Sequence, residues 1–433
     1  MSAHSTPPGE EPEHQDSAGE RGRERAAMFR TLLTSSHLST LEQLPELVNR
    51  YAAPVGLLDV LIYLADLQQE VLSPVTGEAS AVHAEEKLNV DGTVAGRAFQ
   101  HGEILPVSPS EADRWWVPLL DGTERLGVLR ITAAQVDPTT VVDMRALASL
   151  IALMVVSKRD LSDYYERLVR RRRMNVAAEM EWRLMPSRTF ATDRVMISGV
   201  MEPAYAISGD AFDYAVDGRT VHLAVFDAMG HDTAAGLTVQ LALGAARNAR
   251  RHGVGLAECS VAVEDALRDQ FGYLRYVTGI IATLDTETGA LEWLSRGHHP
   301  PVIIRSRATV NLDCPPAPPM GTDLTTAPVT VCRHQLHPGD RLLLYTDGII
   351  EARSARGQEF GLERFTDFLI RHQVDELPVP ETLRRLVRRH LEFHQGKLDD
   401  DATVLLLEWH GPAGYAPSES ADLVGLPRAG GDA

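Results

Sequence analysis

The chain has 433 residues, of which 44% are hydrophobic and 24% are charged, a composition typical of soluble globular proteins and not of disordered or fibrous ones. This length predicts two or three domains. The net charge of -18 would repel polyanions, so we expect no nucleic-acid partner and no attachment to an anionic membrane, and we read most of the acidity as solubilising surface charge.

The three cysteines, Cys259, Cys314 and Cys332, are odd in number and have no metal-ligand spacing. They predict a reducing compartment, no disulfide scaffold and no thiolate zinc site. The N-terminal segment is charged where a signal peptide would need an apolar core, and the longest apolar run, Ala146 to Val156, is too short to span a bilayer. We therefore expect a cytoplasmic protein without a membrane segment.

Two polar segments, residues 1–27 and 412–433, are predicted to be disordered tails because they are rich in Pro, Gly, Glu and Ser. A first domain is predicted over residues 28–158, with helical patterns at both ends. Between them lie four strand-like runs, "LDVLIYLAD", "EVLSPV", "WWVPLLD" and "ERLGVLRITA".

A helical linker is predicted over residues 159–186. Apolar residues recur there at helical spacing, and neither Pro nor Gly interrupts the pattern from Val141 to Met185. This length predicts one continuous helix that enters the next domain, as a parallel coiled coil in a homodimer. The basic block Arg170 to Arg173 is interpreted as a solvated helical face, although it could contact an acidic partner.

A second domain is predicted over residues 187–411. Its strand candidates are "VHLAVF", "TGIIATLD", "ALEWLS", "PVIIR", "DRLLLYT" and "ATVLLLEW", and helical patterns cover Thr233 to Arg250, Ala257 to Gln270 and Leu362 to His394. Hairpins combined with separate helices predict antiparallel sheets with helices packed outside. The whole chain is thus expected to be an α+β protein.

Acidic residues stand at the ends of several predicted strands of this domain. Asp227 follows "HLAVF", Asp347 follows "LLLYT", Asp399 to Asp401 precede "ATVLLLEW", and Asp210 and Asp213 lie in "ISGDAFDY". A single Asp at a strand end is most often a turn or cap residue. Several together indicate a site for hard divalent cations, which take carboxylate oxygens as ligands.

Six motifs of this domain occur in the order and spacing of a known family: "ISGDAFDY", "VFDAMGHDTAAGL", "TLDTETGALEWLSRGHHPPVIIR", "PPMG", "GDRLLLYTDGIIEARSARGQEFGLERF" and "DDDATVLLLEW". The domain resembles the PPM-type metal-dependent serine/threonine phosphatases, in particular the SpoIIE/RsbU branch. This resemblance implies an αββα sandwich. The first domain, with "DGTVAGRAFQHGE", resembles a GAF domain, which implies a sensor for an unknown small molecule or protein.

The resemblance also implies two divalent cations, Mn²⁺ or Mg²⁺, and the residues that hold them. Asp227 would bridge both ions beside the backbone carbonyl of Ala228, and Asp347 and Asp400 would complete the second ion. Asp210 would stand near the first ion, directly or through water, so that Asp227 and Asp210 are the expected catalytic residues.

Some neighbouring residues remain alternatives. Asp213 is a weaker candidate, and Asp399 or Asp401 would replace Asp400 if the register were shifted by one. Imidazole has a near-neutral pKa that suits a general acid. Three histidines are therefore candidates, although a structural role is expected for each: His231, His298 and His299.

The implied activity is hydrolysis of phosphoserine or phosphothreonine in a small signalling protein, an anti-sigma-factor antagonist of the STAS type, under control of the sensor domain. Two other hypotheses remain open. One is a non-catalytic module that binds a partner through a degenerate phosphatase fold, against which the complete set of carboxylates argues. The other is hydrolysis of phosphodiesters or nucleotides by the same metal pair.

Overall fold

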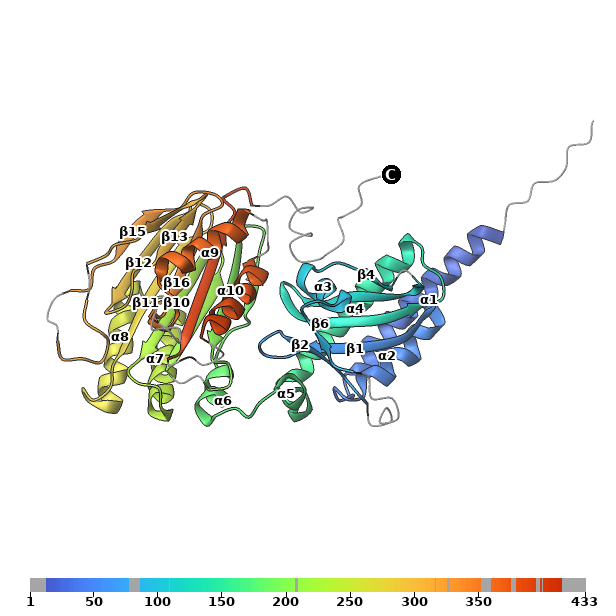
Figure 1. The fold of residues 1–433 in the computed structure, drawn as a ribbon, viewed down its shortest axis with the longest axis horizontal. Coiled ribbons are helices and arrows are strands. Elements are labelled where there is room, and N and C mark those ends of the chain that lie inside the picture. Colours follow the sequence, from blue (N-terminus) through green and yellow to red (C-terminus); the bar gives the residue numbers. More distant parts are fainter. Residues whose placement is uncertain are drawn as a thin grey trace, which may run out of the picture. The chain divides into compact units, whose positions relative to one another are not determined.

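The computed structural model describes residues 13–77, 86–108, 110–206, 209–315, 317–324, 328–351, 360–374, 379–394, 398 and 400–414. The chain forms two compact units (Figure 1). The first comprises Met1–Asp121 and Arg125–Arg171, and the second comprises Gly122–Glu124 and Arg172–Ala433. Of the predicted C-terminal tail, the part beyond residue 414 lies outside the described residues.

The first unit is built on a six-stranded sheet with the order β3-β2-β1-β6-β5-β4. Its strands are β1 (Leu57–Ala65), β2 (Val71–Pro74), β3 (Leu88–Asn89), β4 (Leu105–Ser108), β5 (Glu111–Asp121) and β6 (Glu124–Ala133). Its helices are α1 (Glu13–Ser36), α2 (Leu44–Ala52), the 3-10 turn η1 (Ala53–Val55), α3 (Val94–His101), α4 (Pro138–Arg159) and α5 (Asp163–Val169). All four predicted strand runs are found, but α1 begins well inside the N-terminal segment that we expected to be disordered, because its later turns bury Met28 and Leu32.

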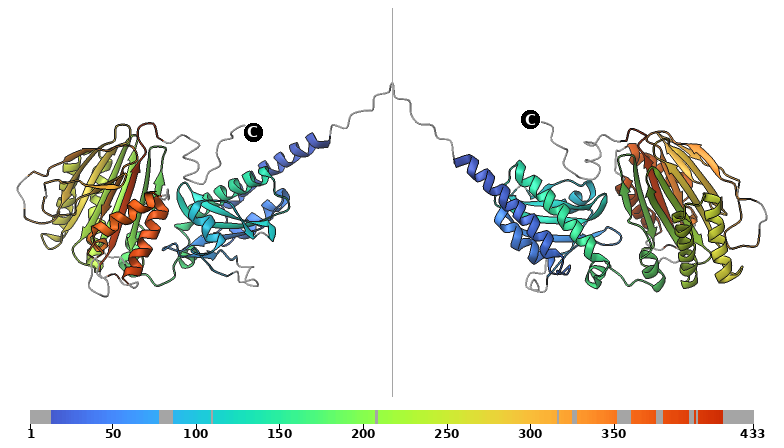
Figure 2. Two further views of the ribbon diagram at one scale, coloured as in Figure 1. Left: turned by 45° about the horizontal axis from the view of Figure 1, so that its top comes forward. Right: turned by 180° about the vertical axis from the view of Figure 1, so that it is seen from behind.

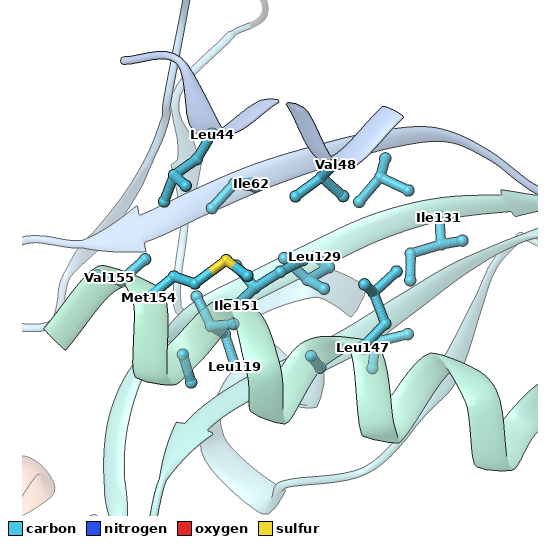
Figure 3. Close-up of a cluster of buried hydrophobic side chains, with 14 of the residues drawn as sticks. Leu44, Val48, Ile62, Leu119, Leu129, Ile131, Leu147, Ile151, Met154 and Val155 are labelled. Atoms are coloured by element: carbon cyan, nitrogen blue, oxygen red, sulfur yellow. The ribbon is translucent and has the colours of Figure 1, made fainter. Parts of the chain in front are cut away.

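The main core of this unit lies between one face of the sheet and α1, α2 and α4. Figure 3 shows Val48 of α2, Leu129 of β6 and Ile151 of α4 in this layer. On the other face, Phe99 of α3 packs in a smaller cluster with Tyr63 and other sheet residues. The GAF-like identity of this unit stays a prediction.

Helix α4 is long and apolar enough to cross a membrane by length and composition alone. Its buried side chains, among them Met144, Leu147 and Ile151, belong to the core of the first unit. Core helices of globular domains meet the same two criteria.

The prediction of one continuous helix from Val141 to Met185 is wrong. The structure has α4, α5 and then α6 (Val176–Trp182), separated by non-helical residues. Ser162 and Asn175 each have extended backbone and accept a backbone N–H from the third residue that follows, so each is an N-cap that starts a new helix. The coiled-coil dimer was inferred from that continuous helix and therefore loses its support.

The second unit contains two antiparallel sheets, with the orders β15-β12-β11-β10-β9 and β14-β13-β16-β17-β8-β7. The first has β9 (Asp210–Asp217), β10 (Thr220–Ala228), β11 (Val277–Asp285), β12 (Ala290–Arg296) and β15 (Cys332–Gln335). The second has β7 (Thr189–Ala191), β8 (Val195–Glu202), β13 (Val302–Arg305), β14 (Ala308–Asn311), β16 (Arg341–Tyr345) and β17 (Ala402–Trp409). The helices are α6, α7 (Thr233–Arg251), α8 (Leu256–Phe271), η2 (Asp347–Ile349), α9 (Leu362–Val374) and α10 (Val379–Phe393).

Strand alternation divides the side chains of this unit into three apolar layers. Val225 of β10 and Leu405 of β17 belong to a core between the two sheets. Phe226, one residue on from Val225, packs with α7 and α8, whereas Leu406 packs with α9 and α10. The predicted αββα sandwich is thereby confirmed, and its outer helices are visible on the two sides of the sheets in Figures 1 and 2.

One disulfide, between Cys314 and Cys332, contradicts the prediction of no disulfide scaffold. Cys332 begins β15, which pairs with β12 at the edge of the sheet, and this pairing brings the strand back to the segment of Cys314. The contact depends on the tertiary fold and leaves no signal in the spacing. Cys259 is a buried free thiol.

Candidate metal centre

Two of the predicted ligands lie side by side on the first sheet of the second unit. Asp210 and Asp227 are direct register partners across β9 and β10. Each lies two residues from a side chain of the core between the sheets, Phe212 and Val225 respectively, so both point to the side of the second sheet. Carboxylates directly opposite each other repel, which is destabilising unless a cation compensates their charge.

The second sheet supplies the other acidic residues, and Thr346 joins the two groups. Thr346 follows β16 and is fully buried. Its hydroxyl donates to Oδ2 of Asp210 at 2.7 Å, and its backbone N–H donates to the Thr403 carbonyl at 3.0 Å. Thr346 stands in the "YTDG" motif next to Asp347, and no role was predicted for it.

All four predicted carboxyl groups have a raised pKa, chiefly because of burial. For Asp227, burial and then the carboxylates of Asp347, Asp400 and Asp401 raise the pKa to about 7. For Asp210, burial and then the neighbouring Asp227 raise the pKa well above its ordinary value. A cluster of oxygen donors that repel one another in this way fits the preference of Mg²⁺ and Mn²⁺ for carboxylate ligands.

These pKa shifts predict that the metal-free protein loses stability as the pH rises. A carboxyl group whose pKa is raised by folding stabilises the fold below its unfolded pKa, 3.8 for Asp, and this contribution is lost as the pH rises through the folded value. Between pH 5 and pH 7.5, wild-type protein in chelator is expected to lose about 1–2 kcal/mol more unfolding free energy than Asp227→Asn. Urea denaturation at several pH values measures this difference, and equal slopes for both proteins would contradict it.

Asp213 is buried but does not join the cluster. Asp213 directly follows Phe212 on β9, and neighbouring side chains of a strand point to opposite faces of the sheet. Its side chain therefore points to the side of α7. Its carboxylate accepts from Arg247 at 2.8 Å and from Arg250 at 2.6 Å. Asp213 is therefore an ion-pair residue, and the weaker prediction that it binds metal is wrong.

Asp400 and Asp401 both approach the cluster, and Asp399 lies outside the described residues. Asp401 is 7% exposed, and its charge raises the pKa of Asp210 and of Asp227. Asp400 is exposed and lies near Asp347, and its Oδ1 accepts the backbone N–H of Asp401 at 2.9 Å. Asp400 remains the proposed ligand because of its position in the motif "DDDATVLLLEW".

His298 has both ring nitrogens in contact with the protein. Nδ1 lies 2.8 Å from Oγ1 of Thr278, and Nε2 lies 3.0 Å from the carbonyl oxygen of Tyr345. Burial lowers the pKa of His298 to about 4, so the ring is neutral at pH 7. These contacts agree with a structural role that ties β11 to β16.

His299 lies at the edge of the acidic cluster. Its ring stacks on Tyr345. Donor atoms of His299, Asp347 and Glu351 lie within 4.8 Å of one another, a spacing that could hold a metal ion. Glu351, which lies four residues after Asp347, was not predicted as a metal-binding residue. The charge of His231 acts on Asp400, where it partly offsets the rise in the pKa of that carboxyl group.

The loop before β9 brings a glycine close to the predicted carbonyl ligand. The carbonyl oxygen of Gly209 accepts the backbone N–H of Ala228 at 2.8 Å, and the N–H of Gly209 donates to Oε1 of Glu181 at 3.0 Å. Gly209 has a φ of 136°. A side chain is disfavoured at this backbone angle, so the position requires glycine.

The second unit thus combines an αββα sandwich with carboxylates that converge from both sheets. Residues 217–410 match the family described as Stage II sporulation protein E (SpoIIE). This match confirms the predicted resemblance of the second unit to the SpoIIE/RsbU branch.

Among curated proteins, the chain is similar to Protein IcfG of Synechocystis sp., with 24% identity over 131 residues. These residues are 30% of this chain and 20% of IcfG, so the chain spans about a fifth of that relative.

Among solved structures, it is similar to the RsbU and RsbW domains of a Mycobacterium tuberculosis protein, with 24% identity, a TM-score of 0.45 and coverage of 51% of this chain and 62% of the other. It is also similar to the SiaA PP2C domain of Pseudomonas aeruginosa, with 22% identity, a TM-score of 0.47 and coverage of 54% and 94%.

Proposed function

We propose that the chain is a metal-dependent phosphoprotein phosphatase that acts on phosphoserine or phosphothreonine. The observation that carries this proposal is the convergence of Asp210 and Asp227 from one sheet with Asp347 and Asp400 from the other, in the part of the chain that matches SpoIIE. Two divalent cations, Mn²⁺ or Mg²⁺, would lower the pKa of an attacking water and offset the charge of the phosphoryl group.

Each residue of the cluster has a separate task in this proposal. Asp227 would contact both cations, together with the carbonyl of Ala228, and Asp347 and Asp400 would complete the second site. Asp210 would serve the first site, with its carboxylate oriented by the hydroxyl of Thr346. The burial that raises the pKa of Asp210 and Asp227 also excludes water, which strengthens their interaction with a cation.

We further propose a phosphorylated anti-sigma-factor antagonist of the STAS type as the substrate, because the second unit resembles the SpoIIE/RsbU branch. The GAF-like first unit would bind an unknown small molecule or protein and regulate the phosphatase. A cytoplasmic location remains part of this proposal, although a disulfide is uncommon in a reducing compartment.

Phosphate release from a phosphoserine-containing STAS protein in a Mn²⁺ titration tests the activity on the full chain. Turnover that requires Mn²⁺ and exceeds turnover of a cyclic dinucleotide is expected. Preference for the dinucleotide would instead establish the phosphodiesterase alternative. Absence of both turnover and calorimetric Mn²⁺ binding would favour the non-catalytic partner-binding module.

A further inference from the structure

Glu181 is a buried acid to which the proposed chemistry gives no task. It lies on α6, the last helix before the strands of the second unit, and is 0% exposed. Oε1 accepts the Gly209 N–H, whereas Oε2 is buried and has no hydrogen-bond partner in the described part of the structure. A buried polar atom without a partner is costly, so this position calls for an explanation beyond packing.

Helix α6 is attached at three points to the chain segment that leads into β9. The backbone N–H of Asn175 donates to the Tyr205 carbonyl at 2.9 Å, and Nε1 of Trp182 donates to the Ala204 carbonyl at 2.7 Å. The third attachment, from Glu181, reaches the residue that immediately precedes β9. Of these three contacts, the one from Glu181 is nearest to the acidic cluster.

Gly209 connects Glu181 to two proposed ligands through its backbone. Asp210 is the next residue in the chain, and the Gly209 carbonyl accepts the N–H of Ala228. On the other side of Glu181, α7 approaches closely, since a Cβ on Gly236 would lie 3.1 Å from Oε1. The carboxyl group is thus confined between α7 and the backbone of the loop.

We propose that Glu181 is a positioning residue, which holds the Gly209 backbone so that Asp210 and the Ala228 carbonyl are placed to bind a cation. This inference rests on the proposed function, and it concerns the single contact between Glu181 and Gly209.

The test compares Glu181→Met, Glu181→Gln and Trp182→Phe in the full chain. Methionine keeps much of the volume but cannot replace the carboxyl acceptor. Burial raises the pKa of Glu181 to about 8, so the group is mostly neutral at pH 7 and glutamine is a close substitute. Trp182→Phe is the matched control, because it removes another hydrogen bond of α6 without touching Gly209.

The measurements are Mn²⁺ binding by calorimetry, the Mn²⁺ concentration for half-maximal phosphate release, and the Tm in chelator. We expect Glu181→Met to weaken Mn²⁺ binding about 10-fold or more, with Glu181→Gln within about 2-fold of wild type and Trp182→Phe unchanged in Mn²⁺ binding. An equal loss in Trp182→Phe and Glu181→Met would overturn the inference in favour of general helix docking.

Unchanged Mn²⁺ binding in Glu181→Met would also overturn the inference, while leaving the phosphatase proposal intact if wild-type turnover depends on Mn²⁺. If Glu181→Met does not fold, Glu181→Gln and Gly236→Ala remain informative. In Gly236→Ala, the added Cβ on α7 would crowd Oε1 of Glu181, so this variant is expected to bind Mn²⁺ more weakly. Mn²⁺ binding equal to that of wild type would contradict the proposed placement of Glu181. Wild-type protein that binds no Mn²⁺ would instead refute the proposed function itself.

Discussion

Asp227→Asn is expected to reduce Mn²⁺-dependent phosphate release on the order of 1000-fold while leaving the protein folded. Asp227 lies opposite Asp210 and is affected by the charges of Asp347, Asp400 and Asp401, so it is the carboxylate nearest the centre of the cluster. Asparagine keeps the shape but removes the negative charge. In chelator the variant should be at least as stable as wild type, because one source of repulsion is gone.

Steady-state phosphate release and thermal unfolding of the same preparations check this prediction. Asp217→Asn is the matched control, since it makes the same chemical change at an exposed position at the other end of β9. Its activity should equal that of wild type. Phosphate release by Asp227→Asn at more than a tenth of the wild-type rate would show that Asp227 is not the central ligand.

Gly209→Ala is expected to lower both stability and activity. A Cβ at this position would lie 2.8 Å from the Gly230 carbonyl oxygen and 3.3 Å from that of Ala228, and the φ of 136° is itself unfavourable for alanine. The backbone must move, which displaces Asp210. We expect a loss of about 2–3 kcal/mol in unfolding free energy and a loss of activity of about 100-fold.

The comparison with Gly218→Ala separates backbone strain from displacement of the site. Gly218 also has a positive φ, 57°, in the turn between β9 and β10, but a Cβ there would meet no atom within 4 Å. This variant should lose only about 1 kcal/mol and keep its activity. Chemical denaturation and a Mn²⁺ titration of both variants provide the test, and equal activity in both would refute the role given to Gly209.

The strands of both units and the acidic motifs of the second unit could be predicted because they depend on local pattern. The runs "ERLGVLRITA" and "ATVLLLEW" coincide with β6 and β17. The positions of Asp227 and Asp347 at strand ends also follow from the chain itself. Strand alternation would have excluded Asp213, since it is three residues from Asp210 and therefore on the opposite face of β9.

Other features could not be predicted because they depend on contacts between distant segments. The disulfide requires β15 to return to the edge of the sheet, and the task of Thr346 requires a residue of the other sheet within hydrogen-bond distance. The breaks in the linker are a different case. The sequence contains the capping residues Ser162 and Asn175, and they end the helical pattern even though neither Pro nor Gly interrupts it.

The hydrogen bond from Thr346 to Asp210 crosses from one sheet of the sandwich to the other. The proposed ligands are likewise divided, with Asp210 and Asp227 on one sheet and Asp347 and Asp400 beside the other. A complete cation site therefore exists at only one alignment of the two sheets. A slip of one sheet by a fraction of a residue would separate the proposed ligands without breaking any strand pairing, so the proposed activity depends on the packing between the sheets and not only on the fold of each sheet.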